Sequence, residues 1–121
     1  MNFEELTQYQ LDIIGVNGCG AKSSILKPPY AIFFEASCNY HDVGYSRGGT
    51  EEDRFDDDVG FLNALLKDCN KVQNKIKRMW YISWSYAYFL AVRLEGWKNY
   101  TYRHEILSLE QLLDECTKRT I

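Results

Sequence analysis

The residues best suited to chemistry in this sequence are His41 and Asp42, with Cys38 before them and Tyr45 after them. On a helix, positions three or four apart share a face, whereas neighbours point about 100° apart. His41 therefore shares a face with Cys38 and Tyr45, while Asp42 points in another direction. An imidazole titrates near neutral pH and is suited to general base catalysis. The spacing predicts a base at His41 and a separate duty for Asp42.

A second carboxylate, Asp58, is expected to face His41 from the next helix. Glycines at 48–49 end the first helix and Thr50 begins the second, whose apolar residues recur at three- and four-residue steps around Asp58. Helices joined by so short a turn should lie antiparallel. A buried carboxylate needs donors, which His41 and Tyr45 supply. A lone histidine is more often structural, but this pairing would fix its tautomer and leave a ring nitrogen as base.

A glycine-rich loop, residues 15–24, precedes the first of these helices. Three glycines in its first six residues allow the backbone to turn back and present carbonyl oxygens inward. The loop lacks the spacing and the preceding strand of a phosphate-binding loop. Carbonyls and the Asp42 carboxylate are hard oxygen ligands, which suit calcium better than zinc. Such a loop can also be a simple connection. A cleft that a base and a bound metal both face is therefore a hypothesis.

The elements that must position these residues are nearly all helical. The sequence predicts one mainly α domain over 1–121, and periodicity with Pro, Gly and capping signals places its elements. The predicted helices run over residues 3–14, about 29–46, from 51 onward, 76–95, and in a tail at about 105–118. The fold expected is a small helical domain with two antiparallel site helices, a loop and additional packing helices.

Composition limits the function classes. The formal net charge of −3 gives no electrostatic footprint for nucleic acid, and 45% hydrophobic residues are typical of a globular chain. The acidic start of the chain lacks the features of a secretory signal, and the longest apolar stretch is shorter than a membrane span. Four cysteines leave three disulfide pairings open.

Three stretches resemble one known family, the secreted phospholipase A2 superfamily in its bacterial and fungal branch. The run from Cys38 to Tyr45 is similar to its catalytic helix, whose pattern is cysteine, two residues, His-Asp, two residues and tyrosine. Asp58-Val59-Gly60-Phe61, with Cys69 eleven positions after the aspartate, resembles the second catalytic helix. Asn17-Gly18-Cys19-Gly20 resembles the calcium loop. The match covers residues 15–96, so the tail helix lies outside it.

The resemblance implies calcium-dependent hydrolysis of the sn-2 ester of glycerophospholipids. His41 would deprotonate the attacking water, Asp58 would hold the imidazole, and Tyr45 would brace Asp58, with Asp57 as the alternative partner. No acyl-enzyme is implied. The partner would be a phospholipid membrane or micelle surface, with no nucleic acid and no obligate protein partner. The family's location is extracellular; without a signal, a cytoplasmic location or release by lysis is the alternative.

The resemblance also implies a metal site and a disulfide. Calcium would be held by Asn17, Gly18, Gly20 and Asp42, and the loop would be tied to the helix by a disulfide between Cys19 and Cys38.

Two other interpretations compete with hydrolysis. Cys19, Cys38, His41 and perhaps Cys69 could form a structural zinc site, because Cys and His two residues apart are a common ligand spacing. A calcium-binding helical module without catalysis would keep the fold but not the reaction. Trp80 and Trp84 are expected in the core, with a face for lipid as the alternative.

Overall fold

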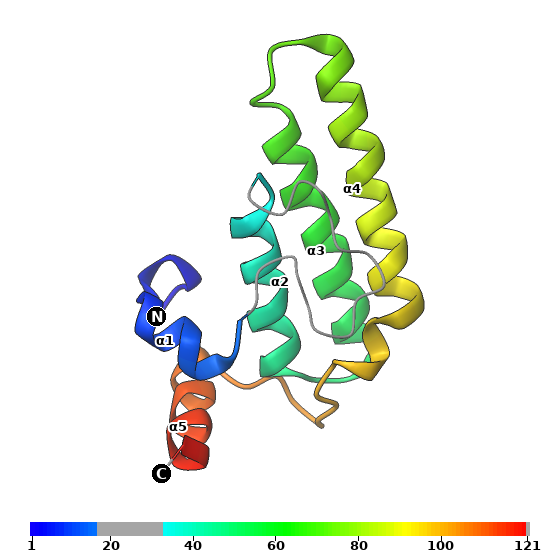
Figure 1. The fold of residues 1–121 in the computed structure, drawn as a ribbon. Helices are drawn as coiled ribbons and strands as arrows, with labels where there is room; N and C mark the ends of the chain where they lie inside the picture. The colour runs from blue at the N-terminus through cyan, green and yellow to red at the C-terminus, as the bar shows by residue number, and fades with distance from the viewer. Residues whose placement is uncertain (17–32, 121) are drawn as a thin grey trace.

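The computed structural model describes residues 1–16 and 33–120, and the fold is mainly helical, as predicted (Figure 1). Within these ranges the only β pairing is an isolated bridge between Gly49 and Tyr102. The elements in chain order are η1 (Phe3–Glu5), α1 (Gln8–Ile14), α2 (Glu35–Arg47), α3 (Glu51–Cys69), α4 (Lys75–Glu95), η2 (Gly96–Lys98) and α5 (Leu109–Thr120).

A three-residue turn makes α2 and α3 antiparallel. Gly48 (φ 74°) and Gly49 (φ 140°) adopt positive φ values, which glycine tolerates without steric cost. Thr50 then caps α3: its hydroxyl accepts the Asp53 amide at 3.3 Å, and the Asp53 carboxylate accepts the Thr50 amide at 2.8 Å. The stop and start signals leave no room for a longer connection, so α3 returns directly alongside α2 (Figure 1).

Helix α4 runs back along α3 and completes a three-helix unit with α2. The Asn74 side chain caps it by accepting the amides of Ile76 and Lys77 at 2.9 and 3.0 Å. It begins one residue before the predicted 76–95 helix and ends at Glu95, as predicted. The core between the helices contains Phe34, Cys38, Phe61, Leu65, Cys69 and Tyr88.

The N-terminal segment and α5 pack together beside α2 and differ from the prediction. The expected helix over 3–14 is two elements, because Thr7 and Gln10 form a capping box that starts α1 afresh at Gln8. The tail helix begins at Leu109 rather than at 105. Ser108 explains the shift: it exchanges capping hydrogen bonds with Gln111 at 2.8 and 3.1 Å.

Several predictions fall on residues 17–32, outside the described part of the chain. They are the calcium loop with Asn17, Gly18 and Gly20, the start of the predicted 29–46 helix, and Cys19, the expected partner of Cys38. Cys69 and Cys116 are free thiols in separate core clusters. No helix within the described residues is long and apolar enough to cross a membrane.

Candidate functional site

The antiparallel packing of α2 on α3 brings His41, Tyr45 and Asp58 together. His41 Nε2 lies 2.7 Å from Asp58 Oδ1, and the Tyr45 hydroxyl donates to the same oxygen at 2.6 Å. All three side chains are buried, and Asp58 has no exposed surface. His41 and Tyr45, four residues apart on α2, therefore present two donors to one carboxylate of α3.

The imidazole is held in one orientation. The ring of Phe61 on α3 stacks on it with centroids 4.4 Å apart, and the Tyr45 ring lies 4.2 Å away. Burial lowers the pKa of His41 below its ordinary 6.5, and this effect outweighs the opposing bond to Asp58. Nε2 is committed to Asp58, while Nδ1 makes no hydrogen bond to a described residue. The neutral ring therefore keeps Nδ1 as its basic atom near pH 7.

Two arginines bind the other oxygen of Asp58. Arg93 on α4 donates to Oδ2 at 2.6 Å, and Arg54 on α3 lies 3.4 Å from the same atom. Burial alone would raise the pKa of Asp58, but hydrogen bonds from His41, Tyr45 and Arg93 lower it below its ordinary 3.8. Asp58 therefore stays ionised, with each oxygen engaged by two donors.

Sequence reasoning missed both arginines. Arg54 stands four residues before Asp58, a spacing that favours ion pairs within one helix, so a local signal was present. It also donates to the Val92 carbonyl of α4 at 2.9 Å and to the Tyr45 hydroxyl of α2 at 3.3 Å, so it links three helices at the site. Arg93 stands 35 residues after Asp58 and breaks an apolar run; only the packing of α4 on α3 brings it near the carboxylate.

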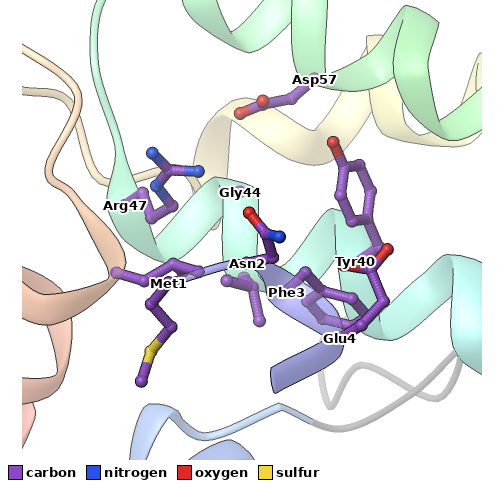
Figure 2. A pocket seen from close by; sticks show the side chains of 10 residues that line it. Met1, Asn2, Phe3, Glu4, Tyr40, Gly44, Arg47 and Asp57 are labelled. Carbon is purple, nitrogen blue, oxygen red and sulfur yellow. The ribbon is translucent and has the colours of Figure 1, made fainter. Parts of the chain in front are cut away.

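Asp57, the alternative partner of His41, lies elsewhere. Its carboxylate packs against Gly44 and lines a pocket of about 310 Å³ with Tyr40, Arg47 and the first residues of the chain. Figure 2 shows the Asp57 carboxylate and the Arg47 guanidinium above this pocket. The adjacent carboxylates of Asp57 and Asp58 thus lie in different surroundings, and His41 pairs with Asp58.

The replacement Asp57→Asn is expected to stabilise the protein at alkaline pH. Burial, then the charge of Asp58, raise the pKa of Asp57 from 3.8 to about 7, despite Arg47 nearby. A raised folded-state pKa favours folding below 3.8, and this contribution is lost as pH rises through about 7. Asp57→Asn should therefore raise the free energy of unfolding relative to the parent, and this difference should grow by on the order of 3 kcal/mol between about pH 5 and pH 9. Urea unfolding over this pH range measures it. Asp56→Asn, an exposed neighbour, should show no such growth; equal pH slopes would refute the assignment.

Gly96, directly after α4, gives Tyr45 its room. A methyl group at position 96 would overlap the Tyr45 hydroxyl, whereas one at Gly60 on α3 would meet nothing within 4 Å. Gly96→Ala should therefore destabilise the protein by about 1–3 kcal/mol through overpacking. Gly60→Ala is the matched control and should stabilise α3 by up to about 1 kcal/mol, since alanine favours helix. Thermal unfolding of both variants tests this, and equal shifts would contradict it.

The proposed metal ligands are only partly described. Asp42 is a half-buried carboxylate of α2, one position from His41 and hence on another side of the helix. Asn17, Gly18 and Gly20 lie outside the described residues. Within the described ranges, no group of three or more His, Cys, Asp or Glu side chains could hold a metal ion. An oxygen site built on loop carbonyls with a single carboxylate would not form such a group.

The geometry removes Cys69, the optional fourth ligand, from the alternative zinc site. This residue stands eleven positions after Asp58, or about 16 Å along α3, whereas His41 contacts Asp58 itself. The Cys69 sulfur lies 3.3 Å from the Ser85 hydroxyl of α4. Cys69 and His41 are therefore too far apart to share one zinc ion.

Comparison with known proteins adds no family to this geometry. No protein-family model, no curated protein and no solved structure matches the chain.

Proposed function

We propose that this protein is a calcium-dependent phospholipase A2, which hydrolyses the sn-2 ester of glycerophospholipids at a membrane or micelle surface. The observation that carries the proposal is the buried contact of 2.7 Å between His41 Nε2 and Asp58 Oδ1, which leaves Nδ1 as the base. The resemblance of the Cys38–Tyr45 and Asp58–Phe61 stretches to that superfamily supplies the substrate class.

In the proposed reaction, Nδ1 of His41 takes a proton from a water molecule as the oxygen attacks the ester carbonyl carbon. The imidazolium formed is stabilised by the ionised Asp58, and the leaving alkoxide then receives the proton. Tyr45 and Arg93 hold the carboxylate in place through bonds of 2.6 Å each. No covalent acyl intermediate forms, because the nucleophile is water.

A calcium ion fits the donor types proposed for it. The Asp42 carboxylate, the Asn17 side-chain oxygen and the carbonyls of Gly18 and Gly20 are all hard oxygen ligands. Bound there, calcium would polarise the ester carbonyl as a Lewis acid. We also propose the Cys19–Cys38 disulfide, which would tie the loop to α2 near His41, and an extracellular location that permits it.

Product analysis with a mixed-chain phospholipid tests this function. The substrate carries different acyl chains at sn-1 and sn-2, and mass spectrometry identifies the released acid and the lysophospholipid, with calcium and with a chelator. We expect the sn-2 acid only, and only with calcium. Release of the sn-1 acid, or of neither acid at any calcium concentration, would contradict the proposal.

A further inference from the structure

Helix α4 carries a second apolar face on the side away from α3. Its large side chains are 55–81% exposed and form two groups, one near each end of the helix, and the second group continues into η2. Within each group, three- and four-residue steps place the side chains on one side of the helix. We define the outer face of α4 by Ile76, Met79, Trp80, Leu90, Leu94 and Trp97. The opposite side of the helix packs on α3 through the buried Ser85 and Tyr88.

The outer face is long, and it has an apolar group at each end of α4, with the small residues Ser83 and Ala87 between them. From residue 76 to residue 97 it spans about 30 Å, the length of the whole helix. Of the two tryptophans expected in the core, only Trp84 packs against it, whereas Trp80 is 55% exposed. Exposed apolar patches of this extent usually mark a surface that binds a partner or a membrane.

The segment that contains this face is rich in cations, although Arg93 and Arg103 in it pair with Asp58 and Glu115. Residues 70–103 include seven lysines and arginines and a single acid, Glu95, although the whole chain carries a net charge of −3. Three of these cations, Lys75, Lys77 and Arg78, begin α4 and form no ion pair with a carboxylate of the described residues. They lie beside Ile76 and Met79, at the most exposed end of the outer face.

We propose that the outer face of α4 lies on a phospholipid surface that contains anionic headgroups. Its leucines, isoleucine and methionine would enter the boundary between headgroups and acyl chains, with Trp80 and Trp97 at the interface. Lys75, Lys77 and Arg78 would contact lipid phosphates. A symmetric dimer through this face is disfavoured, because the face of a second copy offers those cations only Glu95 in return.

This inference deepens the proposed function, on which it rests for the choice of lipid over other anionic surfaces. The same helix donates Arg93 to Asp58, so the lipid contact and the proposed base site share one rigid element. No described helix is long and apolar enough to cross a membrane, and the proposal places α4 along the lipid surface.

Vesicle cosedimentation in a calcium chelator tests the surface apart from hydrolysis. The full chain is expected to bind vesicles of phosphatidylcholine mixed with phosphatidylglycerol more tightly than phosphatidylcholine alone. Leu90→Ser with Leu94→Ser should lower partitioning by about 100-fold, or about tenfold per leucine. Lys75→Gln with Lys77→Gln should lower it by about 25-fold on the anionic vesicles only.

The matched controls are exposed apolar residues elsewhere. Tyr9 on α1 is 73% exposed and Ile106 is 47% exposed, so Tyr9→Ser and Ile106→Ser should leave partitioning unchanged. The inference is overturned if the double leucine variant partitions like the parent. A second result would also overturn it: the parent is a dimer, the double leucine variant is a monomer, and vesicles bind neither the parent nor the variant.

Hydrolysis separates failure of this surface from failure of the proposed function. The double leucine variant should cleave a monomeric short-chain phosphatidylcholine at the parental rate, yet cleave anionic vesicles more slowly. A parent that cleaves neither substrate but still partitions through Leu90 and Leu94 would refute the enzyme and support the surface.

Discussion

Asp58→Ala is expected to lower the free energy of unfolding by about 3–5 kcal/mol, because it leaves the donors of His41, Tyr45 and Arg93 without their buried acceptor. The lost carboxylate accepts His41 and Tyr45 on one oxygen and Arg93 and Arg54 on the other. Arg54 is only 4% exposed, but it keeps its bonds to Glu51 at 2.7 and 2.8 Å, so the loss falls on the other three donors. Urea unfolding near neutral pH measures the loss.

The matched control is Asp56→Ala, two positions earlier on α3. Asp56 is exposed, so this variant should lie within about 0.5 kcal/mol of the parent. Equal unfolding midpoints for Asp58→Ala and the parent would show that the three donors do not depend on this carboxylate, and the description of the site would be wrong.

Asp42→Ala is expected to lower calcium-dependent hydrolysis by at least about 100-fold, since metal stabilisation of transition-state charge is worth several kcal/mol. Asp42 is the only carboxylate in the proposed ligand set, so its loss should weaken calcium binding as well. Hydrolysis rates over a calcium titration, together with calorimetry of calcium binding, measure both effects.

Glu35→Ala provides the control for the loss of one negative charge from α2. Glu35 is exposed at the start of that helix, so its variant should keep the parental calcium response. An Asp42→Ala variant whose rate rises with calcium along the parental curve would remove Asp42 from the proposed metal site.

The contact between His41 and Asp58 could be predicted because its causes are local. The Gly48-Gly49 stop and the Thr50 cap fix a short turn, and the apolar pattern around Asp58 fixes which side of α3 faces α2. The choice between Asp57 and Asp58 follows from the same periodicity, since neighbours on a helix point about 100° apart.

Other features depend on contacts that no short pattern contains. Arg93 reaches Asp58 only because α4 packs on α3. In the sequence, Arg93 indicates only that a charged residue interrupts an apolar helix. Trp80 stands at a spacing typical of core residues, yet α4 is apolar on two sides and the sequence does not say which side is covered. The helix boundaries near Thr7 and Ser108 differ from the prediction because capping boxes at these residues start the helices later than the apolar pattern indicates.

The most direct test of the central claim is fatty acid release from phospholipid vesicles by the parent and by His41→Ala, each with calcium and with a chelator. We expect release by the parent only when calcium is present, and a rate lower by about 10²–10⁴-fold for His41→Ala, the contribution typical of a general base. Calcium-dependent release that survives His41→Ala at the parental rate would contradict it.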